Sequence, residues 1–344
     1  MGRSITVFGG DGFIGRHVVQ RLAKRGDTVR VAVRRPDAAA FLKPLGNVGQ
    51  VVPVQANVRD DASVSAAVAG ADAVVNLVGI LCEGGKQTFA DVHARAPGRI
   101  ARAATEAGVS RLVHLSAIGA DRASPSAHGR SKAAGEAAVA EAFPAATILR
   151  PSVVFGPEDG FINKFAELLR LSPVVPLFFD ARKMPKMHID GIFVVPEFDA
   201  GTTRMQPVYV GDVADAVVAS LDRNAEGGAT FELGGPSVYT FREVMELILR
   251  ELGLRKPFVP VPYFAADIGA FFVQQIPGFF AQQLPMPPVT RDQMKMLRLD
   301  NVVSEDAAGL AALGIVPTAA EVIVPTYLGR AQSGRMDNSA LPQA

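Results

Sequence analysis

Apolar residues in the first 150 positions recur with two different periods. Short runs rich in β-branched residues, such as SITVF (4–8), TVRVAV (28–33) and RLVHLS (111–116), are typical of strands. Segments 12–26 and 89–108 lie between such runs and have helical spacing. Further strands are predicted at 50–55, 71–79 and 146–152, and further helices at 64–70 and 131–143. Strands that alternate with helices predict a parallel sheet covered by helices on both faces.

The pattern changes after Pro151. Helical periodicity returns at 161–171, 211–223 and 241–253, whereas 178–206 has no clear period and is predicted to be a long loop or hairpin. We therefore predict an α/β protein with a doubly wound, Rossmann-type domain and a smaller C-terminal α/β portion. The predicted limits are 1–155 for the first domain and 156–330 for the second portion, with a disordered tail at 331–344.

Composition and charge narrow the class of protein. The 344 residues are enough for a sizeable core, and the formal net charge of +1 provides no strong field to recruit nucleic acid. Cys82 is the single cysteine, which favours a reducing compartment. The first strand begins by Ile5, so we expect no leader peptide, and no window predicts a membrane span. No metal is predicted, because the histidines lie far apart at positions 17, 93, 114, 128 and 188.

A glycine-rich segment, GGDGFIG, follows the first strand and opens the first helix. Gly9, Gly12 and Gly15 have the spacing that permits a tight turn, close approach of a pyrophosphate to the backbone, and close packing of helix against strand. The pyrophosphate would lie at the helix N-terminus, beside Phe13, Ile14 and Arg16. A turn that binds no ligand is the alternative.

The end of the second strand distinguishes between the two nicotinamide dinucleotides. Folds that bind NAD usually have an acidic residue there, which binds the ribose 2′-hydroxyl, but this sequence has Arg34 and Arg35. A guanidinium group suits a 2′-phosphate, and Arg16 adds positive charge nearby. The sequence therefore predicts NADP(H); two solvated surface arginines are the alternative.

The motifs GGDGFIG, QANVRD, VVNLVG, HLSAIGA, HGRSK and ILRPSVVFGP occur in the order seen in extended and atypical short-chain dehydrogenase/reductases, which the chain resembles. The resemblance implies that Asn57 and Val58 border the adenine and that Val78 and Gly79 line the cofactor channel. It also implies that Ser116 is the serine of the catalytic triad and that Lys132 holds the nicotinamide ribose. Pro151, Ser152 and Val153 would pack beside the nicotinamide.

Longer motifs resemble a narrower family. EAFPAATILRPSVVFGPEDGFINKFAELL, QPVYVGDVADAVVASL, FELGGPSVYTFREVMELIL and two late segments are similar to the dehydrogenase-fold accessory subunit of respiratory complex I. The similarity covers nearly the whole chain, apart from 180–205, which looks like an insertion. It implies bound NADPH without turnover, complex I subunits as partners, and a structural role at the joint of the peripheral and membrane arms. A bacterial counterpart would lie peripherally on the cytoplasmic face of the inner membrane.

Position 128 bears on whether the protein is an enzyme. The active short-chain enzymes have a tyrosine four residues before the lysine, and it acts as general acid/base, but this sequence has His128 before Lys132. A histidine ring is shorter than a phenol, and the nearby lysine would favour neutral imidazole. We therefore predict a retained cofactor site with a degenerate triad. The alternatives are a histidine-based acid/base in an active NADP-dependent reductase or sugar-nucleotide epimerase, a free-standing NADP(H) redox sensor, and a surface histidine at a helix start.

The segment 258–289 is rich in phenylalanine, proline and glutamine. Its residues Phe264, Ile268, Phe271 and Phe272 are spaced to share one helical face, and Phe279, Phe280 and Leu284 would extend that face. We predict an apolar docking surface for a neighbouring subunit, with contact at the membrane surface. The alternative is that these side chains close the C-terminal core.

Overall fold

The computed structural model describes residues 2–182, 186–190, 193–223, 228–265 and 290–329, and the chain forms two compact units that are interleaved in the sequence. The first unit contains the residues up to Val154, then Val208–Gly235 and Val303–Pro317. The second contains Phe155–Pro207, Pro236–Val302 and the described residues from Thr318 onward. The chain therefore leaves the first unit at Val154 and returns to it twice.

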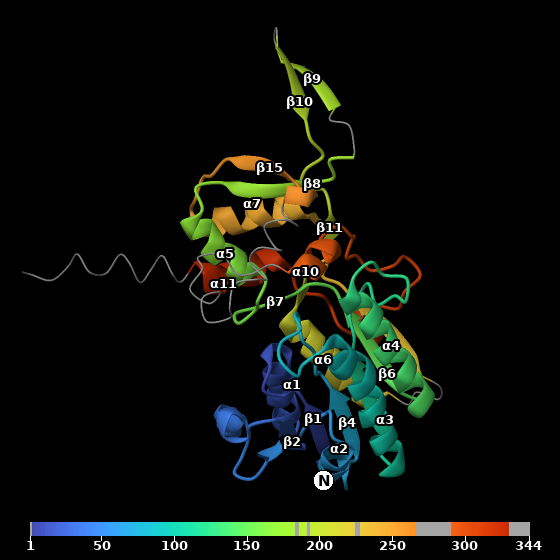
Figure 1. Ribbon diagram of the computed structural model, residues 1–344. Helices are drawn as coiled ribbons and strands as arrows, with labels where there is room; N and C mark the ends of the chain where they lie inside the picture. Colours follow the sequence, from blue (N-terminus) through green and yellow to red (C-terminus); the bar gives the residue numbers. More distant parts are fainter. Residues whose placement is uncertain (1, 183–185, 191–192, 224–227, 266–289, 330–344) are drawn as a thin grey trace, which may run out of the picture. The chain divides into compact units, whose positions relative to one another are not determined.

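A seven-stranded parallel sheet forms the centre of the first unit (Figure 1). Its order is β3-β2-β1-β4-β5-β6-β13. The strands are β1 (Ser4–Phe8), β2 (Thr28–Val33), β3 (Val51–Gln55), β4 (Ala73–Asn76), β5 (Arg111–Leu115), β6 (Thr147–Pro151) and β13 (Ala229–Leu233). The order reverses between β1 and β4, which is the arrangement of a doubly wound dinucleotide-binding sheet. The predicted fold class is confirmed.

Helices cover both faces of this sheet, as predicted. α1 (Phe13–Lys24) and α6 (Val210–Asp222) pack on one face, and α2 (Asp61–Val68), α3 (Ala96–Glu106) and α4 (Ala127–Ala142) pack on the other (Figure 1). Adjacent residues of β5 show the two faces, because Val113 belongs to the apolar cluster with α1 and α6 while Leu112 belongs to the cluster with α2, α3 and α4. The strands are apolar on both sides for this reason.

Short helical segments complete the first unit. They are the 3-10 helices η1 (Asp37–Leu45) and η3 (Leu310–Leu313) and the π-helical turn η2 (Ala90–Arg95), which leads directly into α3. The short strand β12 (Val208–Tyr209) precedes α6. Leu310 is buried in the same apolar cluster as Val213 of α6, so a late segment of the chain contributes to the core of the first unit.

The second unit combines short strands with helices. Its elements are β7 (Val154–Phe155, which begins in the first unit), α5 (Ile162–Leu171), β8 (Val175–Phe179), β9 (Lys186–Asp190), β10 (Phe193–Glu197), β11 (Arg204–Met205), β14 (Tyr239–Thr240), α7 (Phe241–Leu252), β15 (Phe258–Pro262), α10 (Arg291–Met296) and α11 (Ala320–Leu328). β9 and β10 pair in antiparallel register, so the segment 178–206 contains a hairpin. β15 pairs in parallel with β8.

Two predictions fall largely outside the described residues. The docking segment 258–289 is described only to Ala265, where β15 and an exposed Phe264 are seen, and the tail 331–344 is not described. Among the described residues, no helix is both long enough and apolar enough to span a membrane.

Candidate functional site

The residues predicted to bind a cofactor gather at one edge of the sheet. The carboxyl ends of parallel strands meet at the same edge, and the predicted residues follow those ends. Gly9, Gly12, Phe13, Ile14, Gly15 and Arg16 follow β1, Arg34 and Arg35 follow β2, Asn57 and Val58 follow β3, Val78 and Gly79 follow β4, Ser116 follows β5, Pro151 ends β6, and Ser152 and Val153 follow it. This edge is the candidate site.

The glycine loop between β1 and α1 is built for close backbone approach. Gly9 has φ +76°, in the left-handed region that favours glycine. A Cβ at Gly15 would lie 2.2 Å from the carbonyl oxygen of Gly9, so only glycine fits where the helix meets the strand. Gly12 is the N-cap residue of α1 and is exposed, and the first turn of α1 contains no acidic residue. The free N–H groups of that turn therefore suit an anion.

Three arginines lie around this loop. Arg34 and Arg35 are exposed at the end of β2, and neither makes a hydrogen bond or ion pair within the described part of the chain. The Arg16 guanidinium lies over the ring of Phe41, 5.3 Å from its centroid, and Arg16 Nε donates to the Gly12 carbonyl oxygen at 3.4 Å. Positive charge is thus available where a ribose phosphate would lie.

Hydrogen bonds hold the ends of β3 and β4 in place. Asn57 donates through its backbone N–H to Ser63 Oγ at 2.9 Å, and its Oδ1 accepts from the backbone N–H of Arg59 at 3.1 Å. After β4, the backbone N–H of Val78 donates to Asn76 Oδ1 at 3.1 Å. These bonds engage the polar groups of both segments locally, so the segments form fixed walls of the site.

Helix α4 brings Lys132 to the same edge. Ser126 caps the helix by accepting a hydrogen bond from the backbone N–H of Gly129 at 2.9 Å, which fixes the first turn. Lys132 is buried, and its Nζ donates to the carbonyl oxygen of Leu115 at 3.3 Å. A Cβ added to Gly79 would lie 3.6 Å from Lys132 Nζ, so α4 and the ends of β4 and β5 meet at this amine. Ser116 Oγ is also buried and has no hydrogen-bond partner among the described residues.

His128 belongs to a buried aromatic group rather than to the surface. It is 7% exposed, and its ring lies edge-on to Phe89 at 5.7 Å and to His93 at 4.9 Å between centroids. The alternative of a surface histidine is therefore wrong. His93 Nε2 accepts from the backbone N–H of Ile80 at 2.9 Å, while its Nδ1 faces Ser131 Oγ at 3.2 Å. This arrangement requires a neutral His93 ring with its proton on Nδ1.

A third histidine, His114 on β5, lies near Lys132 of α4. Its Nδ1 accepts from Asn76 Nδ2 at 3.1 Å, and its buried Nε2 has no partner in the described part of the chain. Burial, and next the charge of Lys132, lower the pKa of His93 to about 2 and that of His114 to about 3. Burial also lowers the pKa of Lys132 to about 8, although the charge of Glu136 acts in the opposite direction.

Sequence reasoning missed His93 and His114 as members of this cluster. For His114 a signal existed, because a lone polar residue within the apolar strand run RLVHL indicates a buried, partnered side chain. His93 had no such signal, since its neighbours in the helical segment include exposed charged residues. Among the described residues, no group of three or more histidine, cysteine, aspartate or glutamate side chains could hold a metal ion.

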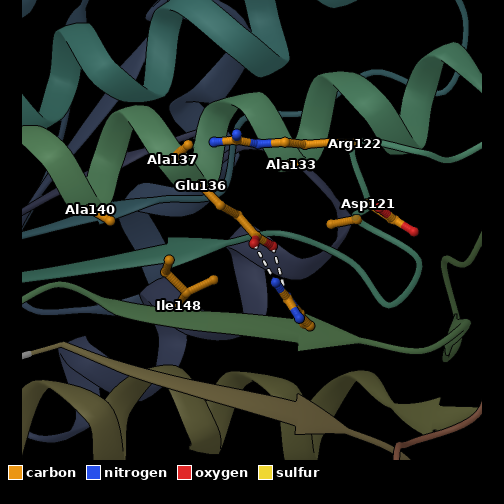
Figure 2. Close-up of a pocket in the computed structure, with 9 residues that line it drawn as sticks. Asp121, Arg122, Ala133, Glu136, Ala137, Ala140 and Ile148 are labelled. Atoms are coloured by element: carbon orange, nitrogen blue, oxygen red, sulfur yellow. Dashed lines mark hydrogen bonds and ion pairs between the residues drawn. The ribbon is translucent and has the colours of Figure 1, made fainter.

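An ion pair supports the outer side of α4. A hollow of about 390 Å³ lies between α4 and β6. In it, Glu136 of α4 accepts two hydrogen bonds from Arg150 of β6, at 2.9 and 2.6 Å; dashed lines mark these bonds at Glu136 in Figure 2. A second carboxylate, Glu232 of β13, lies 3.6 Å from the same guanidinium. One guanidinium is therefore shared between two carboxylates, from α4 and from β13.

The sheet reversal between β1 and β4, with a glycine loop at that point, defines a Rossmann-type dinucleotide-binding protein. More narrowly, the chain belongs to the NAD dependent epimerase/dehydratase family, which matches residues 5–234. Membership supports a nicotinamide dinucleotide as the ligand of the glycine loop. The fold is also that of the UDP-glucose 4-epimerase of Thermus thermophilus, solved with NAD, at 21% identity and a TM-score of 0.61 over 94% of this chain and 98% of that one.

Mitochondrial proteins are more similar in sequence. The chain is 37% identical to the Arabidopsis thaliana protein called NADH dehydrogenase [ubiquinone] 1 alpha subcomplex subunit 9, mitochondrial, over 91% of this chain and 74% of that protein. It is 32% identical to the Mus musculus protein of the same name, over 98% of this chain and 83% of that protein. The similarity therefore extends beyond the family match at 5–234 to nearly the whole chain.

Proposed function

We propose that this protein is a non-catalytic, NADPH-holding accessory subunit of respiratory complex I. The observation that carries the proposal is the extent of the similarity to the alpha subcomplex subunit 9 proteins, which reaches 98% of the chain. A shared Rossmann domain alone would give a match limited to the dinucleotide-binding part. The subunit would act by stabilising or assembling the joint between the peripheral and membrane arms, as a peripheral protein on the cytoplasmic face of a bacterial inner membrane.

The choice of NADPH is supported by charge at the end of β2. Arg34 and Arg35 are exposed there without partners among the described residues, and Arg16 lies beside the same loop. A 2′-phosphate would receive charge-assisted hydrogen bonds from them, whereas the 2′-hydroxyl of NADH would not. When bound, the nucleotide would supply a hydride-carrying ring; the residues of this chain would hold its pyrophosphate and ribose.

The absence of turnover is supported by the surroundings of His128. The residue is 7% exposed and its ring packs against Phe89 and His93, so it is poorly placed to exchange a proton with a substrate. Lys132 retains a use without chemistry, because its ammonium can donate hydrogen bonds to the nicotinamide ribose. Ser116 would contribute its hydroxyl at the same edge of the sheet.

A specific observation favours the competing function, an active NADP-dependent reductase or epimerase. Ser116 Oγ is buried without a partner among the described residues, and the pKa of Lys132 is lowered to about 8 by burial, as would suit proton transfer near neutrality. The two functions differ in one measurement, since only the enzyme oxidises NADPH in the presence of aldehyde, ketone or sugar-nucleotide substrates. A rate that disappears in His128→Ala would establish the enzyme.

The accessory role is tested by affinity purification of the tagged full chain from detergent-solubilised membranes. We expect the other subunits of complex I to copurify, together with bound NADPH that survives chromatography. Recovery of the chain with nucleotide but without complex I subunits would contradict the accessory role and favour the free-standing sensor.

A matched pair of glycine variants distinguishes a loss of nucleotide binding from a general loss of stability. Gly12→Val places a side chain where the pyrophosphate would approach, and should abolish bound nucleotide. Gly84→Val is the control, because a Cβ at Gly84 meets no described atom within 4 Å and its φ is not in the left-handed region. Equal nucleotide content in the two variants would argue against the glycine loop as the binding site.

A further inference from the structure

The buried polar groups at the carboxyl ends of β4 and β5 are neutral or positive. Lys132 donates to a single carbonyl oxygen, that of Leu115, and forms no ion pair with any residue that the structure describes. Ser116 adds a hydroxyl without a partner in the same described set, and the rings of His93 and His114 are neutral. The ammonium of Lys132 is therefore the dominant charge of this buried region.

The titratable groups that face Lys132 come from three elements. They are His93 of η2, His114 of β5 and, one turn further along α4, Glu136. The charge of Glu136 is already engaged by the two hydrogen bonds from Arg150. Burial lowers the pKa of Lys132 to about 8, so the amine is still mainly protonated at pH 7 and loses its charge above pH 8.

The geometry of the sheet fixes which half of a dinucleotide would approach Lys132. A pyrophosphate would lie at the N-terminus of α1, and the arginines lie at the end of β2, so the adenosine half would extend toward β2. The other half must then extend across the reversal to the ends of β4 and β5, where Lys132 Nζ lies 3.6 Å from the Cβ position of Gly79. This half carries the nicotinamide ring, which is a cation when oxidised and neutral when reduced.

We propose that the site selects the reduced nucleotide, because the buried Lys132 ammonium repels the oxidised, cationic nicotinamide ring. The proposal rests on the proposed function and adds the residue and the physical cause by which the site would discriminate NADPH from NADP⁺. Two like charges about 5 to 10 Å apart, at an effective dielectric constant of about 20, give a difference in affinity of roughly ten- to hundredfold or more. Occupancy of the subunit would then follow the ratio of NADPH to NADP⁺.

The test is calorimetric titration of the nucleotide-free full chain with NADPH and with NADP⁺ at pH 7. We expect NADPH to bind at least about tenfold more tightly. Lys132→Met, which removes the charge but keeps a similar length, should reduce this ratio, and Lys132→Arg should preserve it. Arg34→Ala is the control, because both nucleotides carry the same 2′-phosphate; it should weaken both and leave the ratio unchanged.

A pH series provides a readout that needs no substitution at Lys132. In the unmodified chain, the affinity ratio should fall as pH rises from 7 to about 9.5 and the amine loses its proton. Equal affinities at pH 7, or a ratio that depends neither on pH nor on Lys132→Met, would overturn the redox selectivity. Failure of both nucleotides to bind would instead overturn the proposed NADPH-holding function, and the inference with it.

Discussion

Burial determines how the titratable side chains at the candidate site behave. Lys132 and His114 are almost inaccessible, and for each the largest effect on the pKa is the loss of water. His93 is held in one tautomer by the backbone N–H of Ile80. The histidine at position 128 therefore does not simply replace a phenol, because its ring packs edge-on against Phe89 and against the fixed ring of His93.

Cofactor choice can be tested at two residues. In Arg34→Ala combined with Arg35→Ala, we expect NADPH binding to weaken by about 1.5 to 3 kcal/mol while NADH binding changes little, because only NADPH has the 2′-phosphate. Calorimetry with both nucleotides measures the change. Arg102→Ala, an exposed arginine on α3, is the control and should leave both affinities unaltered. Equal affinities for NADPH and NADH in the unmodified chain would contradict the assignment.

The buried histidines predict an acid-sensitive fold. The folded pKa values of His93 and His114 lie below the ordinary value of 6.5, so the unfolded chain takes up protons first as the pH falls. The two histidines should therefore leave the free energy of unfolding unaffected above pH 6.5. Below pH 6.5 they should lower it, by up to about 1.4 kcal/mol per pH unit for each histidine. Urea unfolding between about pH 5 and 7 measures this slope, which His114→Gln should reduce. A slope that His114→Gln leaves unchanged would count against the role of His114.

At the scale of elements, local patterns predicted most of the first unit, and the exceptions depend on distant partners. The apolar runs and helical periods identified six strands and the helices between them. They did so because the apolar side chains that each of these elements buries recur at its own period along the sequence. β13 was missed, since ATFEL is short and contains Glu232, whose carboxylate approaches Arg150 of β6. The glycine loop, the arginines and Lys132 could be found from motifs. His93 could not, because its contacts to Ile80 and Ser131 exist only in the fold.

The ion pair between α4 and β6 should contribute measurably to stability. Arg150→Met leaves Glu136, which is 7% exposed, without its partner, and should cost about 2 to 3 kcal/mol in the free energy of unfolding. The double variant with Glu136→Leu should cost less than Arg150→Met alone, because no unpaired carboxylate remains at position 136. Arg204→Met, which breaks an exposed pair with Asp300, is the control and should cost under about 1 kcal/mol. Similar losses in Arg150→Met and Arg204→Met would mean that burial does not strengthen the inner pair.

At the scale of the whole molecule, the two compact units are not consecutive segments. The first unit uses three stretches of chain, and its sheet receives β13 only after the chain has passed through β7 to β11. The similarity to the alpha subcomplex subunit 9 proteins spans both units. A partner-binding role would therefore draw on the second unit as well as on the nucleotide-binding one.

Association with a complex can be tested in the phenylalanine-rich segment. Phe271→Ser with Phe279→Ser, at positions outside the described residues, should weaken copurification with complex I subunits and leave NADPH bound, because the change removes apolar contact area. Val316→Ser is a control, because Val316 is an exposed apolar side chain of the first unit. If the isolated double variant unfolds or loses its nucleotide, these residues belong to the core and the docking prediction is wrong.

The return of residues 303–317 to the first unit has a consequence for biosynthesis. Leu310 fills the apolar cluster beside α6, and Glu232 binds this segment through the backbone groups of Ser304 and Ala308. After the ribosome has added Val154, it must add about 150 more residues before this segment is made. At ordinary rates of translation, that synthesis takes roughly 8 to 30 seconds. The nucleotide-binding unit is therefore completed only after about residue 317 has been synthesised, and a nascent chain stalled earlier would expose an unfinished core to chaperones and proteases.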